Sequence, residues 1–229
     1  MLAVRDLRVA YGMSEVIHGV DFSLGNNETL AVMGRNGMGK TTLFKSLIGI
    51  LPARSGAIEM QGQNLVASKS YQRVAKGLAY VPQGRMIFPM LAVTENIETG
   101  LEVTGEKRIP EDIYALFPVL FDMRNRKGGN LSGGQQQQLA IARALASNPK
   151  VLLLDEPTEG IQPSIIKQLA KTLNEIKKMR NLSIIVSEQV LSFATEVADR
   201  VLVMDKGRFV HESVKGEFDT QKISQYLSV

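Results

Sequence analysis

The sequence predicts an α/β fold built on a parallel sheet, and three observations support this prediction. Residues 28–33 read as a buried strand, and residues 42–48, after a glycine-rich stretch, read as a helix. Residues 151–154 are four apolar residues followed by two acids, which is typical of a strand buried on both faces. From residue 131 onward, strand and helix patterns alternate, as they do around a parallel sheet.

The glycine-rich stretch after the first of these strands matches GxxxxGK[ST], the phosphate-binding P-loop. Its glycines let the backbone curl so that N–H groups point at phosphates. We expect Lys40 to reach the β- and γ-phosphates of ATP, Thr41 to ligate Mg²⁺, and Thr42 to pack nearby. The alternative is a turn that only joins strand to helix, and the context argues against it. The nucleotide-binding residues predicted here are Gly34, Arg35, Asn36, Gly37, Met38, Gly39, Lys40, Thr41 and Thr42.

Two acidic residues, Asp155 and Glu156, end the apolar run of residues 151–154. Open α/β sheets bind their ligands at the carboxyl ends of their strands. We predict that Asp155 holds Mg²⁺, directly or through water, and that Glu156 is the general base for the water that attacks the γ-phosphate. The alternative is that both are strand-end acids facing solvent. The P-loop in the same chain favours the catalytic interpretation, and hence a P-loop nucleoside-triphosphatase fold.

A second stretch with anion-binding character lies at Leu131-Ser132-Gly133-Gly134-Gln135. A serine and two glycines at a predicted helix start expose backbone N–H donors at a positively polarised terminus. The chain is therefore predicted to carry two separate phosphate-binding surfaces.

Residues 1–229 are predicted to form one domain, with a core at about 1–91 and 150–229 and a helical subdomain at about 92–149. Short strands with Gly and Asn turns in residues 1–65 indicate an antiparallel sheet beside the P-loop strand. Within 92–130, residues 106–110 are a polar break. The other predicted elements are strands at 7–11, 16–24, 56–60, 151–155, 183–186 and 201–204, and a closing helix at 218–229.

Composition excludes some classes of protein. The net charge of +4 is mild and no basic arm for nucleic acid is present. The absence of cysteine excludes disulfides and cysteine-based metal sites. The first six residues carry charge too early for a signal peptide. No apolar run approaches the roughly 20 residues of a membrane span, so any membrane role is expected to come through a partner.

Over essentially its whole length the chain resembles the ATPase subunits of ATP-binding cassette (ABC) transporters. In that family the signature at residues 131–135 contacts the γ-phosphate of ATP on the other subunit's P-loop. The resemblance therefore implies a head-to-tail dimer, two transmembrane permease subunits, an indirect link to a solute-binding protein, and a peripheral place on the cytoplasmic face of the membrane. The motifs that carry it are Tyr11, residues 34–41, Gln83, residues 131–135 and Asp155-Glu156.

The resemblance also implies roles for two residues outside the P-loop. Tyr11 matches the aromatic residue that stacks on adenine, although an ordinary half-buried strand tyrosine is the alternative. Gln83 matches the glutamine that reaches Mg²⁺ and the attacking water, although a polar turn residue is the alternative. Residues 85–91 are apolar and contain a proline, and either belong to the core or form an exposed groove for a permease helix.

Two positions depart from the general family pattern. Gln189 stands where the family has its switch histidine, and Gln162 stands where it has an aspartate. A glutamine amide can hydrogen-bond the γ-phosphate, but it cannot titrate near neutral pH. We therefore expect weak hydrolysis at this chain's own P-loop, and a heterodimer with a second ATPase subunit that has the usual histidine.

The strings 159–163 and 187–189 resemble the second ATPase of branched-chain amino-acid importers and of their urea and amide relatives. Among these relatives, the urea branch is resembled more closely than the others at residues 81–85, 116–120 and 128–139. We therefore expect an importer of urea or short-chain amides, with branched-chain amino acids as the alternative. A second alternative is a subunit that mainly dimerises under nucleotide control and hydrolyses ATP weakly.

Other P-loop proteins fit the sequence less well. A DNA-repair ATPase would need a long coiled coil between residues 42 and 130, which has too little room for one. A translation-linked cassette protein usually carries two cassettes in one chain. A small-molecule kinase lacks the signature helix.

Overall fold

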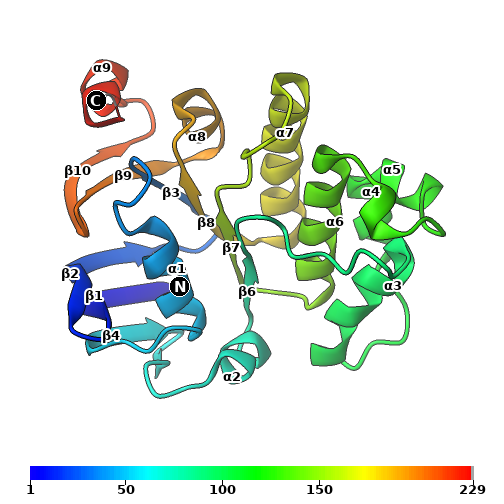
Figure 1. The fold of residues 1–229 in the computed structure, drawn as a ribbon, viewed down its shortest axis with the longest axis horizontal. Coiled ribbons are helices and arrows are strands. Elements are labelled where there is room, and N and C mark those ends of the chain that lie inside the picture. The colour runs from blue at the N-terminus through cyan, green and yellow to red at the C-terminus, as the bar shows by residue number, and fades with distance from the viewer. Residues whose placement is uncertain (228–229) are drawn as a thin grey trace.

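A computed structural model of the chain describes residues 1–227. The centre of the fold is a six-stranded sheet in the order β10-β9-β3-β8-β7-β6 (Figure 1). The five strands from β9 to β6 run parallel, and β10 pairs with β9 antiparallel at one edge. The strands are β3 (Thr29–Met33), β6 (Leu78–Val81), β7 (Val151–Asp155), β8 (Ser183–Glu188), β9 (Arg200–Asp205) and β10 (Arg208–Val214).

A second, antiparallel sheet has the order β2-β1-β4-β5 and lies beside α1 (Lys40–Ile48), at the lower left of Figure 1. It confirms the antiparallel sheet predicted for residues 1–65. The first strand starts earlier than predicted because a bulge at Asp6, with φ of 39°, breaks the apolar alternation. Its strands are β1 (Leu2–Tyr11), β2 (Ser14–Leu24), β4 (Ser55–Met60) and β5 (Gln63–Asn64).

The two faces of the central sheet bury different helices. Along β7, Val151 and Leu153 face a core shared with α1 and the antiparallel sheet, whereas Leu152 and Leu154 face a core shared with the remaining large helices. Successive side chains of a strand point to opposite faces, so a strand covered on both faces must be apolar throughout. This is why β3 and β7 could be recognised as continuous apolar runs.

Most of the helices lie on the face of the sheet away from α1, and those formed within residues 93–180 are on the right in Figure 1. The helices predicted within residues 92–130 are present, and residues 106–110 are irregular as expected. The remaining helices are α2 (Ser70–Ala75), α3 (Val93–Glu98), α4 (Glu111–Leu116), α5 (Pro118–Asp122), α6 (Gly133–Ala146), α7 (Pro163–Arg180), α8 (Leu191–Val197) and α9 (Thr220–Leu227), with 3₁₀ turns η1 (Thr99–Val103) and η2 (Gly128–Asn130).

The strands predicted at 151–155, 183–186 and 201–204 are confirmed as β7, β8 and β9. The closing helix begins at Thr220 rather than at residue 218, and positions 228 and 229 lie outside the described residues. Two strands of the central sheet were not predicted. β6 has only four residues before Pro82, and β10 is a polar edge strand whose side chains alternate between exposed and half-buried.

Candidate active site

The P-loop connects the carboxyl end of β3 to the first turn of α1, as the sequence predicts. Gly39 caps the helix with φ of 109°, a backbone conformation that side-chain-bearing residues rarely adopt. The unpaired N–H groups of this first helical turn point toward the loop, where a phosphate is favoured. Residues of the loop and its surroundings line one cavity: Val16, Asn36, Gly37, Gly39, Lys40, Thr41, Thr42, Gln83 and Glu156.

Lys40 is held across the loop and is almost completely buried. Its Nζ donates hydrogen bonds to the carbonyl oxygens of Gly34 at 2.7 Å and Arg35 at 3.0 Å. The same Nζ lies 2.9 Å from Glu156 Oε1 in an ion pair. Because the two carbonyls fix the ammonium group inside the loop, it is positioned for an anion that enters the cavity.

Asp155, the last residue of β7, accepts three hydroxyl hydrogen bonds. Thr41 Oγ1 donates to Oδ1 at 3.2 Å, Ser187 Oγ donates to Oδ1 at 2.6 Å, and Tyr80 OH donates to Oδ2 at 3.0 Å. Burial raises the pKa of the Asp155 carboxyl above its usual value, while the three hydroxyl donors act in the opposite direction. The carboxylate is thus oriented beside the Thr41 hydroxyl.

Glu156 follows Asp155 and turns its side chain toward the P-loop. Its backbone has φ of 48°, which is uncommon for a residue with a side chain. The conformation is held by its N–H, which donates to the backbone oxygen of Ser187 at 3.1 Å and to Ser187 Oγ at 3.0 Å. Backbone strain of this kind is found at sites where a side chain must point in one direction.

Gln83 and Gln189 both approach the Glu156 carboxylate. Gln83 Nε2 donates to Oε2 at 3.4 Å, and Gln189 Nε2 donates to Oε1 at 3.3 Å. Gln189 Nε2 also donates to Asn36 Oδ1 in the P-loop at 2.8 Å. The amide at the switch position therefore connects the P-loop to the predicted base.

Three residues around this site were not assigned a role from the sequence. Tyr80 and Ser187 hold Asp155, while the carboxylate of Glu188 accepts from the N–H groups of Thr158 at 3.1 Å and Gln189 at 3.0 Å. Burial raises the pKa of Glu188. The available signal was that each of the three lies at or near the carboxyl end of a strand next to β7.

The residues present fit a magnesium ion bound together with phosphate. Mg²⁺ is commonly held by one or two carboxylates, with substrate phosphates and water completing its shell. The Thr41 hydroxyl, which lines the cavity, and the Asp155 carboxylate, which accepts a hydrogen bond from it, are both hard oxygen donors. Within residues 1–227 no group of three or more His, Asp or Glu could hold a metal alone, so phosphate oxygens would have to complete the coordination.

The signature sequence forms the start of α6. Ser132 is the N-cap: its Oγ accepts from the N–H of Gln135 at 3.4 Å, and its own N–H donates to Gln135 Oε1 at 2.9 Å. A Cβ on Gly134 would lie 2.8 Å from Ile165 of α7, so glycine allows the two helices to approach closely. Ser132 itself is exposed.

The signature does not contribute to the P-loop cavity. Helix α6 packs on one face of the central sheet and α1 on the other (Figure 1). The lining of the P-loop cavity includes none of residues 131–135. The exposed helix start is thus a second polar surface, separate from this chain's own P-loop.

Tyr11 ends β1 and is 50% exposed, so its ring is accessible from solvent, and its predicted contact with adenine stays a prediction. It does not line the P-loop cavity. Within residues 85–91, Met86, Phe88 and Met90 are 47–71% exposed, and Met86 and Phe88 line a groove with Arg143. The structure therefore favours the exposed groove over the core for these side chains.

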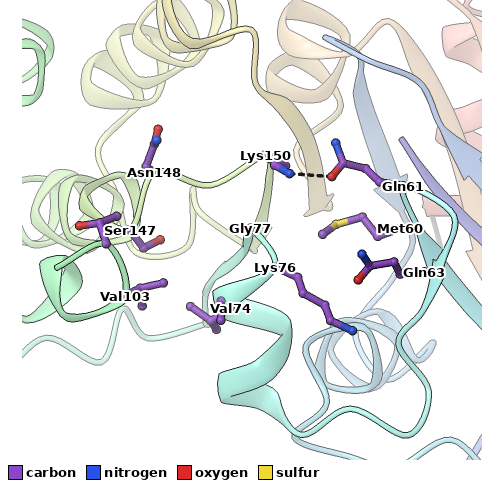
Figure 2. A pocket seen from close by; sticks show the side chains of 12 residues that line it. Met60, Gln61, Gln63, Val74, Lys76, Gly77, Val103, Ser147, Asn148 and Lys150 are labelled. Atoms are coloured by element: carbon purple, nitrogen blue, oxygen red, sulfur yellow. Dashed lines mark hydrogen bonds between the residues drawn. The ribbon is translucent and has the colours of Figure 1, made fainter. Parts of the chain in front are cut away.

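A further hollow of about 300 Å³ lies away from the P-loop, between α2, the end of α6 and the β4–β5 turn (Figure 2). Its lining is mainly polar, and Lys150 Nζ donates to Gln61 Oε1 across it at 2.6 Å. None of the residues predicted to bind ATP lies in it.

The fold and the site define a P-loop ATPase with an added antiparallel sheet and a helical region. A protein-family model described as "ABC transporter" matches residues 17–159. The high-affinity branched-chain amino acid transport ATP-binding protein BraG of Pseudomonas aeruginosa is 36% identical, and the aligned region covers 92% of this chain and 91% of that protein. The probable branched-chain amino acid transport ATP-binding protein LivF of Archaeoglobus fulgidus is 31% identical, and the aligned region covers 95% of this chain and 93% of that protein.

Among solved structures, an ATP-binding cassette captured as a dimer with ADP and Pi superimposes with a TM-score of 0.84 at 21% identity, covering 95% of this chain and all of that one. This similarity confirms the predicted fold. The chain belongs to the ABC transporter family of ATP-binding proteins, and it is an ATPase whose reaction is coupled to transport. The helices of the described chain are too short or too polar to cross a lipid bilayer.

Proposed function

We propose that this chain is an ATP-hydrolysing subunit of an importer for branched-chain amino acids. The observation that carries the proposal is the cavity in which Lys40 and Glu156 face each other beside the Thr41–Asp155 contact. An ammonium group for phosphate, a base for water and a pair of oxygen donors for a metal are the groups that ATP hydrolysis requires.

The roles of the residues follow from their places in the cavity. Bound Mg²⁺, held by Thr41 and Asp155, would neutralise charge on the β- and γ-phosphates. Glu156 would accept the proton of the attacking water, and Gln83 would orient that water beside it. Lys40 would bind the γ-phosphate oxygen in place of the Glu156 carboxylate. The P-loop residues 34–42 would hold the phosphates, and Tyr11 would stack on the adenine.

The separate signature surface supports assembly with another ATPase subunit. The start of α6 would face ATP on the partner's P-loop through Ser132, Gly133, Gly134 and Gln135. The resulting head-to-tail dimer is expected to be a heterodimer in the cell. Two permease subunits would occupy the groove at Met86 and Phe88, one on each ATPase subunit. The chain would then lie peripherally at the cytoplasmic face of the membrane, with a solute-binding protein acting through the permeases.

Branched-chain amino acids replace urea as the proposed solute. The sequence strings favoured urea, but the two relatives described above are named for branched-chain amino acids. The test is uptake of labelled leucine and labelled urea in a strain lacking the gene, with and without the wild-type chain. Restored leucine uptake supports the proposal, whereas restored urea uptake alone returns the assignment to the urea branch.

A subunit that dimerises under nucleotide control and hydrolyses ATP weakly is the second candidate. The observation that favours it is Gln189, whose amide cannot take up a proton near neutral pH. Turnover by the purified chain, compared with turnover in the presence of its partner ATPase, separates the two. Efficient turnover by the chain alone would exclude the second candidate.

A further inference from the structure

Tyr80 brings a phenolic hydroxyl to the oxygen of Asp155 that the P-loop does not contact. Tyr80 lies in β6 and pairs with Leu153 of β7 in the parallel register. Leu153 is two residues before Asp155 in the chain. Its OH donates to Asp155 Oδ2 at 3.0 Å, whereas Thr41 and Ser187 both donate to Oδ1. The two carboxylate oxygens therefore have different partners.

The Tyr80 hydroxyl is the donor in its hydrogen bond to Asp155. The ring packs against the core shared with α1. A buried hydroxyl needs a hydrogen-bond partner, and Asp155 is the partner this one has. A phenylalanine at this position would keep the packing of the ring and lose only the hydrogen bond.

Fixing Oδ2 also fixes the direction of Oδ1. A carboxylate rotates about its last bond unless both oxygens are held, and residues that hold a metal ligand in place contribute to metal affinity. We propose that Tyr80 is a positioning residue that clamps Oδ2 of Asp155 so that Oδ1 faces Thr41 and the metal. The inference rests on the proposed role of Asp155 as a magnesium ligand. Tyr80 itself touches neither metal nor nucleotide in this scheme.

The test compares metal binding in the full-length Tyr80→Phe and Asp155→Asn variants with that in the wild-type protein. Mn²⁺ serves as the probe for the Mg²⁺ site, and its binding to the ADP complex is followed by electron paramagnetic resonance. We expect Tyr80→Phe to weaken Mn²⁺ binding about tenfold while leaving ADP affinity in EDTA unchanged. Tyr71→Phe is the matched control because Tyr71 is 68% exposed on α2, and it should bind Mn²⁺ as the wild type does.

The outcomes separate the two proposals. If Asp155→Asn weakens Mn²⁺ binding and Tyr80→Phe does not, the clamp is wrong and the role of Asp155 stands. If Asp155→Asn leaves Mn²⁺ binding unchanged, the proposed metal site itself is wrong. If Tyr80→Phe lowers ADP affinity in EDTA as much as in the presence of Mn²⁺, Tyr80 acts only on the fold and the clamp is also overturned.

Discussion

Lys40 and Glu156 form an ion pair between the first residue of α1 and the residue that follows β7. The atoms Nζ and Oε1 are 2.9 Å apart, and the two side chains are only 3% and 8% exposed. A γ-phosphate and the Glu156 carboxylate are alternative partners for the same ammonium group. Nucleotide binding is therefore expected to free one oxygen of the predicted base at the moment when that base is needed.

Replacing Glu156 by Gln should retain ATP binding and reduce hydrolysis about 100-fold or more, since general bases commonly contribute at least that much. The charge that competes with the γ-phosphate for Lys40 is also removed, so ATP affinity should rise. Steady-state turnover and equilibrium ATP binding measure the two effects. Glu159→Gln is the control, because Glu159 is exposed and hydrogen-bonds through its backbone: its oxygen accepts from Arg85, and its N–H donates to the backbone oxygen of Glu156. Undiminished turnover of Glu156→Gln would remove Glu156 from the role of base.

Replacing Lys40 by Ala should destabilise the nucleotide-free protein by about 3–5 kcal/mol, because it leaves the Glu156 carboxylate buried without its counter-charge. Part of this loss should disappear in the double variant with Glu156→Gln, because the orphaned charge is then gone. Denaturant unfolding of the wild type, the two single variants and the double variant measures the coupling free energy between Lys40 and Glu156. Additive changes in the free energy of unfolding would mean that the ion pair contributes nothing to the stability of the fold.

Replacing Ser132 by Arg should leave ATP binding to the isolated subunit intact and block ATP-dependent dimerisation. Residues 131–135 do not line this chain's own P-loop cavity, so a bulky side chain there would clash only with a partner. The change also removes the cap of α6, which costs about 1 kcal/mol. Ser132→Ala removes the cap alone and is the control. Light scattering with ATP measures dimerisation, and a collapse of monomer ATP affinity would contradict the in-trans interpretation.

The buried carboxyl of Glu188 should make the protein less stable as the pH rises. Its pKa in the folded state is raised above the value of 4.5 expected when unfolded, because burial disfavours the charge. Between the unfolded and folded pKa values the folded state retains a proton that the unfolded state loses. The free energy of unfolding therefore falls as the pH rises through the folded pKa.

Replacing Glu188 by Gln should remove this contribution, and the measurement is the slope of the free energy of unfolding against pH from about 4.5 upward. The absolute stability of the variant is not the test, because an amide also changes the hydrogen bonds to Thr158 and Gln189. Burial also raises the pKa of Asp155, so part of the slope of unfolding free energy against pH should remain in the Glu188→Gln variant. An unchanged slope would show that Glu188 is charged throughout the range.

Replacing Gln189 by His should raise the ATPase rate of this subunit alone. An imidazole titrates near neutral pH and can carry positive charge toward the γ-phosphate, whereas the glutamine amide cannot. Gln189→Ala, which also removes the bonds to Asn36 and Glu156, is the control and should not raise the rate. An unchanged rate in Gln189→His would mean that the switch position does not limit hydrolysis here.

Local patterns were sufficient for the fold class and for the parts of the site that lie within one stretch of chain. The P-loop, the two acids at the carboxyl end of β7 and the capped start of α6 each depend on residues a few positions apart. The strands β3 and β7 were visible because both faces of the central sheet are covered, which requires apolar residues throughout. The short β6 and the polar edge strand β10 lack that signal.

What the sequence determined by itself was the set of chemical groups: a P-loop, a carboxylate predicted to bind metal, a predicted base and a helix start predicted to bind a second anion. The tertiary structure decided which of them meet. Tyr80 and Ser187 reach Asp155, and Lys40 reaches Glu156, because the strand order β3-β8-β7-β6 puts distant segments side by side. That order, and the placement of α1 and α6 on opposite faces, follow from burying apolar surface over the whole chain, which no local spacing specifies.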